Sequence, residues 1–241
     1  MKIFDCHYHI PSGNEIYAIN DSGRNIIFNS VESYLNHEGG FKQQDSCTVL
    51  FDFRNDPGRN RKLITENKIN AWKIHSRLQK ISSADYPVLI EKLEDLKPEI
   101  PLVIDAFYYG DDLAFQPDLG GIVSIAKRFP HVPVVVAHAG GYQVLRYFYH
   151  LKSIENIYFD LSFSLSYLKL TSAFMDFRNL IKTGDENRIL FGTDFPFVNA
   201  ADQLNTLEEI FLDLKTPEHA MSKIFYSNAI TVFKPNAGDS L

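Results

Sequence analysis

The first residues that could do chemistry stand at the start of the chain, in the segment Asp5-Cys6-His7-Tyr8-His9. Side chains alternate between the two faces of a β-strand, so a strand here points Asp5, His7 and His9 to one face. Two neutral imidazoles on one face can reach a single ion, and imidazole suits Zn, Fe, Ni and Cu. The same spacing also fits two buried, hydrogen-bonded histidines, so other segments must decide between these interpretations.

Ionisable residues also stand at or near the ends of other apolar runs. They are Lys73 and His75 in 71–75, Asp105 after 102–104, His138 after 134–137, and Asp194 after 188–193. An α/β barrel carries its active site at the carboxyl ends of its strands, and its core alone does not need charged residues there. The sequence therefore predicts that these side chains meet at one end of a barrel.

The elements that position them follow an alternating pattern of β-rich runs and amphipathic helical segments, which favours a parallel sheet with crossover helices. Strands are expected over 2–9, 46–53, 69–75, 101–107, 133–138, 156–161 and 188–194, and helices over 86–97, 121–129 and 206–214. The polar region 10–30 is too long for an ordinary connection and is expected to form an excursion over one mouth of the barrel. Since no linker or repeat divides the chain, one domain over 1–241 is expected.

Composition narrows the class of protein and of partner. The 241 residues are 45% hydrophobic and 22% charged, with 24 Lys and Arg against 30 Asp and Glu. This acidic balance argues against a nucleic-acid partner. Two cysteines, no signal-peptide pattern and no run long enough to cross a membrane predict a cytoplasmic protein without a membrane partner. Aromatic residues around 147–149 and 163–177 leave a homo-oligomer open.

Five segments together resemble the amidohydrolase superfamily, specifically amidohydrolase family 2. They are the D-x-H-x-H opening, VVVAHAGG around His138, the following ENIYFDLS, RILFGTDFP around Asp194, and the late SNAITVF. The match runs in order from residue 3 to about 233, and its most specific feature is D-x-H-x-H paired with G-T-D-x-P at opposite ends of the chain. The resemblance implies a distorted TIM (β/α)8-like barrel and a metal-dependent hydrolase, an aromatic-acid decarboxylase or a lactonase.

The resemblance also implies roles for individual residues. His7 and His9 become metal ligands, Asp194 a ligand that also takes a proton from the metal-bound water, and His138 a group that polarises the substrate or assists proton transfer. One divalent ion is expected, Zn first, with Mn or Fe as alternatives. The family usually has a histidine ligand where this chain has Asp105, and a carboxylate can take that place. A lactonase that works without metal also stays open.

A second departure concerns the number of strands. The stretch 53–69 is too short to hold the βα unit that most relatives carry after the second strand. We therefore expect a barrel that is short of one βα unit or that closes with an irregular segment. The run 69–75 then matches either the third or the fourth strand of the family. Some members carbamylate a fourth-strand lysine, whereas Lys73 is expected to pack in the barrel or to bind a substrate anion.

The remaining candidates are predicted to bind substrate. Arg54 and Arg77 follow strands and could clamp a carboxylate, with solvated loop charges as the alternative, and His75 is a further substrate contact. The predicted activity is hydrolysis of an amide, ester or lactone of a small, carboxylated molecule. Decarboxylation is the main alternative, and a degenerate binding module is another. A nuclease on a related barrel fits less well, because this chain is acidic and reads G-T-D-F-P.

Overall fold

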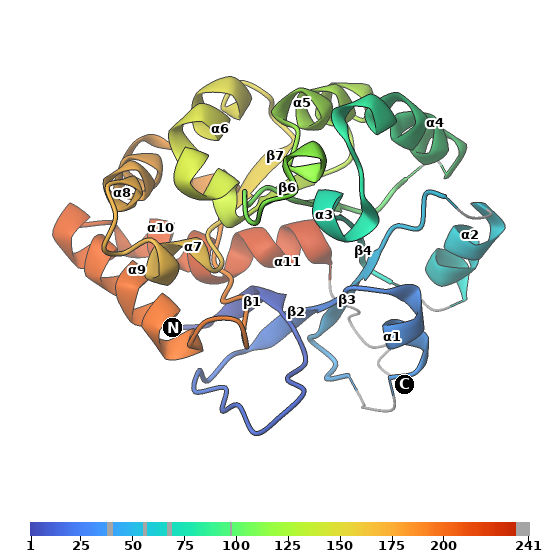
Figure 1. Cartoon of the computed structure of the whole chain (residues 1–241). Coiled ribbons are helices and arrows are strands. Elements are labelled where there is room, and N and C mark those ends of the chain that lie inside the picture. The colour runs from blue at the N-terminus through green and yellow to red at the C-terminus, as the bar shows by residue number, and fades with distance from the viewer. Residues whose placement is uncertain (38–40, 55–56, 67–68, 97, 235–241) are drawn as a thin grey trace.

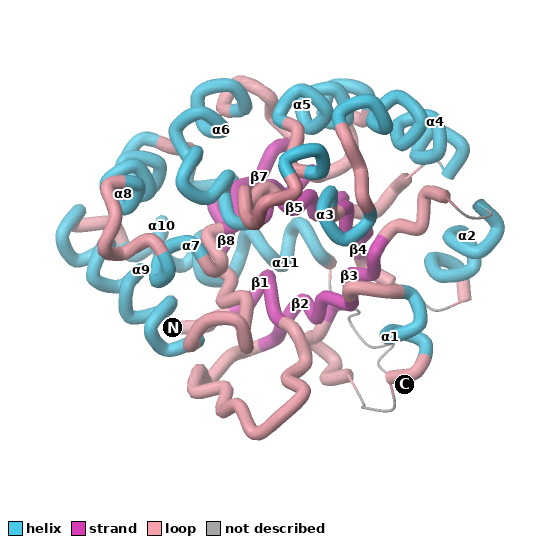
Figure 2. The backbone as a smooth tube through the Cα atoms, in the orientation of Figure 1, coloured by secondary structure: helices cyan, strands magenta, loops and turns pink. Residues whose placement is uncertain are grey.

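Eight parallel strands, paired in chain order, form the sheet of the computed structural model, which describes residues 1–37, 41–54, 57–66, 69–96 and 98–234. The strands are β1 (Phe4–Tyr8), β2 (Gly23–Phe28), β3 (Ser46–Leu50), β4 (Ala71–Ile74), β5 (Leu102–Asp105), β6 (Val134–Ala137), β7 (Ile157–Asp160) and β8 (Ile189–Leu190). Helices surround them on the outside (Figure 1, Figure 2). The expected α/β barrel is confirmed.

The helices fall into the connections between strands and a final group after β8. They are α1 (Val31–Leu35), α2 (Pro57–Thr65), α3 (Ser76–Gln79), α4 (Tyr86–Leu96), α5 (Leu119–Arg128), α6 (Val144–Leu151), α7 (Ser164–Tyr167), α8 (Ala173–Thr183), α9 (Ala200–Leu214), α10 (Glu218–Ser222) and α11 (Asn228–Phe233). Helix α9 begins before the expected 206, because Asn199 caps it by accepting from the amides of Ala201 and Asp202. No helix in the described ranges is long and apolar enough to cross a membrane.

Strand β2 corrects the expectation of a missing βα unit, because it lies inside the region predicted to be an excursion. Its buried Asn25 donates to the Cys6 carbonyl at 3.0 Å and accepts from the hydroxyls of Ser46 at 3.0 Å and Thr48 at 2.8 Å. A polar residue can lie inside a barrel when its neighbours supply such partners. The barrel therefore has all eight strands, and the strand that carries Lys73 is the fourth.

The seam between β1 and β8 is closed by single contacts rather than by a continuous ladder. Backbone hydrogen bonds join Cys6 N to Phe191 O at 3.0 Å, Asp194 N to His7 O at 2.7 Å and His9 N to Phe195 O at 2.8 Å. The β1–β2 register shifts between Asp5 and Tyr8, and Asp5 accepts from Thr193 and Tyr17. Asp5 thus ties the seam together, whereas His7 and His9 lie beside Asp194.

The amino end of the barrel is closed by an apolar plug. Inward-facing residues of the strands pack there against α11, which lies across the middle of the barrel in Figure 1: Phe4, Cys6, Ala71, Val103, Val135 and Leu190 against Ala229, Val232 and Phe233. Because strand side chains alternate, the inward residues two positions after Ala71 and Val103 are Lys73 and Asp105. Their charges therefore lie nearer the carboxyl end of the barrel.

Candidate active site

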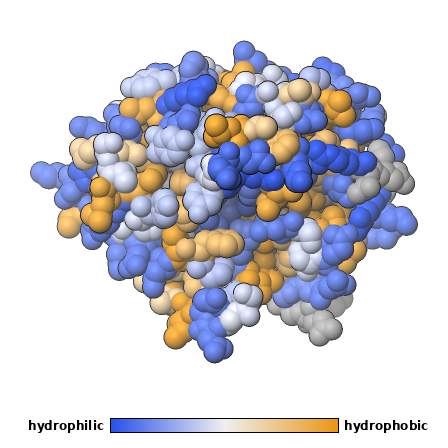
Figure 3. All heavy atoms as spheres, viewed as in Figure 1, coloured by the Kyte–Doolittle hydropathy of each residue, from blue (hydrophilic) through white to orange (hydrophobic). Residues whose placement is uncertain are grey.

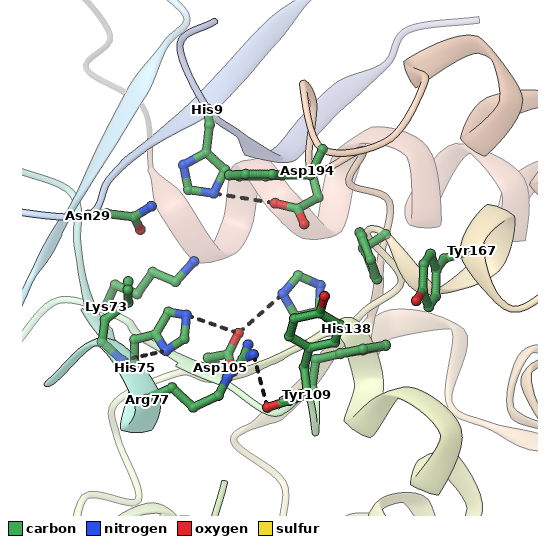
Figure 4. Close-up of a pocket in the computed structure, with 14 residues that line it drawn as sticks. His9, Asn29, Lys73, His75, Arg77, Asp105, Tyr109, His138, Tyr167 and Asp194 are labelled. Carbon is green, nitrogen blue, oxygen red and sulfur yellow. Dashed lines mark hydrogen bonds and ion pairs between the residues drawn. The ribbon is translucent and has the colours of Figure 1, made fainter. Parts of the chain in front are cut away.

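A pocket of about 450 Å³ opens at the carboxyl ends of the strands (Figure 4), on the face that is hollowed near its centre in Figure 3. Its polar lining consists of His9, Asn29, Lys73, His75, Arg77, Asp105, His138 and Asp194, and its apolar and aromatic lining of Leu78, Phe107, Tyr109, Phe163, Tyr167 and Phe197. Most of the residues singled out in the sequence are thus brought together.

One side of the pocket gathers His7, His9 and Asp194. The Nε2 atoms of His7 and His9 lie 3.4 and 3.3 Å from the same oxygen, Oδ1 of Asp194. These three residues form a group whose ligand atoms lie within 4.8 Å of one another. Two imidazoles and a carboxylate are a donor set that suits Zn, Mn or Fe. The residues present therefore fit the divalent ion that the sequence predicts.

The opposite ring nitrogens of these histidines are held from behind. His7 Nδ1 lies 2.7 Å from Asp160 Oδ2, and His9 Nδ1 lies 3.0 Å from the Ile27 carbonyl. A carbonyl and an ionised carboxylate can only accept, so both Nδ1 atoms carry a proton and donate it. Each Nε2 then carries the lone pair that can bind an ion, as metal-ligating histidines usually are arranged.

The pKa values on this side favour the protonation states that bind a metal ion at neutral pH. Burial lowers the pKa of His7 to about 4 and also lowers the pKa of His9. Burial by itself raises the pKa of Asp194, but the electrostatic interactions of its carboxylate with His7 and His9 outweigh burial and hold that pKa well below its usual range. Neutral imidazoles thus face an ionised carboxylate, which is the protonation state that metal binding requires.

Strained backbone marks three residues that line the pocket. His138, Phe163 and Asp194 have φ of 61°, 61° and 63°, in the left-handed region that non-glycine residues seldom adopt. Such conformations cost about 1–3 kcal/mol each and persist where the surrounding structure enforces them, often at functional sites. Here they lie after β6, β7 and β8, where the chain turns away from the strand and directs a side chain at the pocket.

The other side of the pocket is organised around Asp105. Its Oδ2 lies 3.4 Å from His138 Nε2 and 3.7 Å from His75 Nε2, and its Oδ1 lies 3.8 Å from Arg77 Nη2. No group of three ligand atoms that could share an ion includes Asp105 among the described residues. The structure thus places this carboxylate between two imidazoles and the Arg77 guanidinium, apart from the group that His7, His9 and Asp194 form.

The charges on this side support one another. Burial by itself raises the pKa of Asp105, but the electrostatic interactions of its carboxylate with His75 and His138 outweigh burial and hold the pKa well below its usual range. In return, the hydrogen bond to Asp105 and the charge of Asp194 overcome burial and raise the pKa of His138. Burial lowers the pKa of His75 to about 4. His138 is therefore the imidazole in the pocket best suited to keep a proton.

Lys73 lies between the two sides. It is almost fully buried, and its Nζ is 3.3 Å from His7 Nε2. Burial lowers the pKa of its amine, which makes the uncharged form easier to reach. Its position on β4 answers the question that the sequence left open between a third and a fourth strand.

Arg54 is the one substrate-binding candidate that the structure places away from this pocket. Its guanidinium donates to the carbonyls of Gln79 and Lys80, at the end of α3, and stacks on Phe53. Conversely, Asn29 lines the pocket but was not singled out, because it follows the strand that the sequence pattern did not reveal. The aromatic residues Phe163 and Phe197 carried no signal that separates a pocket wall from ordinary packing.

Comparison with known proteins places the chain in a family. The family model described as amidohydrolase matches residues 59–234. No curated protein sequence matches the chain. Solved structures share the fold at low sequence identity.

An uncharacterized TIM-barrel protein from Bordetella bronchiseptica has a TM-score of 0.57 at 18% identity, over 89% of this chain and 79% of its own. A dihydropyrimidinase from Brevibacillus agri has a TM-score of 0.66 at 11% identity, over 96% of this chain and 70% of its own. A D-hydantoinase from a Bacillus species has a TM-score of 0.57 at 11% identity, over 80% of this chain and 58% of its own. The match over 59–234 shows that the chain belongs to the amidohydrolase family and is an enzyme of the amidohydrolase type.

Proposed function

We propose that this enzyme is a metal-dependent hydrolase that cleaves an amide, ester or lactone bond in a small, carboxylated molecule. The observation that carries the proposal is the convergence of two Nε2 atoms on one carboxylate oxygen, at 3.4 and 3.3 Å. The family is generally metal-dependent, which agrees with this donor set. His7, His9 and Asp194 would hold one divalent ion, with zinc the first choice and manganese or iron the alternatives.

When bound, such an ion supplies a Lewis acid that polarises a carbonyl and lowers the pKa of water. The remaining chemistry falls to the chain itself. Asp194, kept ionised by His7 and His9, accepts a proton from the attacking water. His138 lies across the pocket with a raised pKa and supplies a proton or hydrogen bond to the oxygen or nitrogen that gains charge.

The lining also supports a carboxylated substrate. Arg77 lies at the rim, with its Nη1 donating to the Tyr109 carbonyl at 3.3 Å and about a quarter of its side chain exposed. A guanidinium can bind a carboxylate with two hydrogen bonds, and the amine of Lys73 adds a further hydrogen-bond donor deeper in the pocket. Across from them, Phe163 and Tyr167 stack at 4.5 Å and offer a flat apolar wall to the rest of the molecule.

Elemental analysis tests the metal. Protein purified without chelator is expected to hold about one equivalent of Zn, Mn or Fe, and a His7→Ala/His9→Ala variant to hold none. His150→Ala, which removes an exposed histidine on α6, is the matched control and should keep the ion. Absence of metal from the wild-type protein, even after reconstitution, would overturn the proposal and favour a metal-independent lactonase.

A substrate screen tests the reaction. Lactones, carboxylated amides and esters are compared with carboxylated aromatic compounds, and acid formation is followed beside CO₂ release. Acid formation without CO₂ is the expected result. Release of CO₂ from a carboxylated ring would contradict hydrolysis and assign the alternative, decarboxylation.

A further inference from the structure

We propose that Asp160 and Ser162, which lie beneath the pocket, form one hydrogen-bond relay that fixes the same tautomer in His7 and His138. Both relay residues are fully buried, and neither lines the pocket. Asp160 is the last residue of β7, and Ser162 follows two positions later. From beneath the pocket, Asp160 contacts His7 and Ser162 contacts His138. The ligand role of His7 in this inference rests on the proposed function.

The direction of each hydrogen bond follows from its partners. The Asp160 carboxylate accepts at Oδ2 from His7 Nδ1 at 2.7 Å and from the Ser162 hydroxyl at 2.7 Å. Having given its proton to Asp160, Ser162 Oγ can only accept from His138 Nδ1, which lies 3.1 Å away. The Ser162 carbonyl, also 3.1 Å from that Nδ1, can only accept as well.

Both histidines are therefore protonated at Nδ1 and direct Nε2 toward the reaction. For His7 this leaves Nε2 as a ligand atom 3.4 Å from Asp194. For His138 it means that any proton exchanged with substrate passes through Nε2, which lies 3.4 Å from Asp105. The relay thus gives a ligand on one strand and a proton donor on another the orientation that each role needs.

Close packing around Gly192 supports a relay with a fixed geometry. A Cβ at this position would lie 2.8 Å from Asp160 Oδ1, 2.9 Å from His7 Cβ and 3.0 Å from Ser162 Cβ. Real side chains do not approach so closely, so only glycine lets the segment after β8 pass the relay at this distance. Asp160 is further held by the amide of Ser162 at 2.8 Å and the thiol of Cys6 at 3.3 Å, both on Oδ1.

A competing explanation uses the same atoms. His7, His138 and Asp160 also form a group whose ligand atoms lie within 4.8 Å of one another, so they could instead hold a second ion. The hydrogen bonds that Asp160 Oδ2 already accepts from His7 and Ser162 favour the relay. Zinc stoichiometry separates the two explanations.

The test compares Asp160→Asn and Ser162→Ala with the control Cys6→Ala, which removes a donor to the same carboxylate but on its other oxygen. Zn²⁺ affinity and stoichiometry are measured by competition with a chelating dye, and ¹⁵N NMR of the metal-free protein reports which imidazole nitrogen is protonated. Asp160→Asn is expected to weaken Zn²⁺ binding about 10–100-fold with one equivalent still bound. Ser162→Ala should shift the imidazole signals of His138 with little change in Zn²⁺ affinity, and Ser162→Thr should restore them.

Three results would overturn the relay. In the first, Asp160→Asn binds Zn²⁺ as tightly as wild type and its imidazole ¹⁵N signals are unchanged. In the second, Ser162→Ala leaves the imidazole signals of His138 unchanged. In the third, the Zn²⁺ stoichiometry falls from two in wild type to one in Asp160→Asn, which assigns Asp160 to a second ion. If Asp160→Asn fails to fold, the Ser162 pair still decides the question. If wild type binds no Zn²⁺, the proposed function fails, whereas the NMR of the metal-free protein still tests the tautomers.

Discussion

The two sides of the pocket use the same residue types for different purposes. On the β1/β8 side (His7, His9 and Asp194), each histidine turns Nδ1 to an acceptor behind it and leaves Nε2 facing a carboxylate. On the β4/β5 side (His75, Arg77 and Asp105), the carboxylate itself lies within 4 Å of His75, Arg77 and His138.

The comparison of the two sides shows that the spacing of histidines and carboxylates in the sequence does not by itself define a metal site. A carboxylate can serve as a metal ligand when its neighbours are neutral imidazoles with an unprotonated nitrogen, as around Asp194. Where its neighbours include the Arg77 guanidinium and an imidazole with a raised pKa, as around Asp105, its charge is already balanced, and it stabilises a protonated group instead. Replacing Asp194 or Asp105 by asparagine, one at a time, distinguishes the two sides.

The largest effect is expected from Asp194→Asn on the β1/β8 side. The amide keeps the shape but cannot accept a proton from water, so kcat should fall about 10³-fold or more. Zn²⁺ binding should weaken as well, because a charged ligand is lost. Steady-state kinetics with a circular-dichroism check of the fold measures this, and near-normal turnover would end the assignment of Asp194.

Asp105→Asn should have a smaller effect of a different kind. His138 loses the anion that raises its pKa, so kcat is expected to fall about 10²-fold, whereas zinc stoichiometry stays at one. Metal analysis and kinetics on the same preparation give both numbers. Loss of the metal in this variant would instead make Asp105 a ligand, the role that the family resemblance implies.

Arg77→Gln tests whether the β4/β5 side binds the substrate carboxylate. KM for a carboxylated substrate should rise about tenfold or more with kcat little changed, because the lost contact binds the substrate and the transition state equally. The matched methyl ester should show no such change. Arg54→Gln is the control, since Arg54 donates to carbonyls at the end of α3: it should leave KM unchanged and lower the melting temperature.

Much of the fold could be predicted from the sequence because parallel strands covered on both faces are continuous apolar runs, as in 102–104 and 134–137. Strand β2 escaped this rule. It begins with Gly23, Arg24 and Asn25, and the side chain of Asn25 finds its hydrogen-bond partners in Cys6, Ser46 and Thr48 of neighbouring strands. A pairing between strands is not visible in one sequence, so a strand that depends on it looks like a loop.

The candidate site shows the same division. Polar residues that end apolar runs, such as His138 and Asp194, could be found because a core does not explain them. Asn29 could not be found, because its strand was not recognised. The relation between Asp160 and His7 could not be found either, since a distance of 2.7 Å between residues 153 positions apart arises only from the closed barrel.

The smallest effect concerns pH and the histidine on the β4/β5 side. Burial lowers the pKa of His75 in the folded protein to about 4, from 6.5. Above pH 6.5 the imidazole is neutral in both states, and its effect on stability is constant. Between pH 6.5 and 4 the unfolded chain binds a proton that the folded protein does not, so stability falls as pH falls, and below pH 4 the loss is complete.

One proton changes the slope by about 1.4 kcal/mol per pH unit within that window. His75→Asn should reduce the slope of the metal-free protein by up to this amount, because asparagine does not titrate and can still cap α3 in place of the imidazole. Urea unfolding at several pH values measures it. An unchanged slope would mean that His75 is protonated in the folded state and forms an ion pair with Asp105. The two sides of the pocket would then differ more in charge than the distances of 3.4 to 3.8 Å around Asp105 indicate.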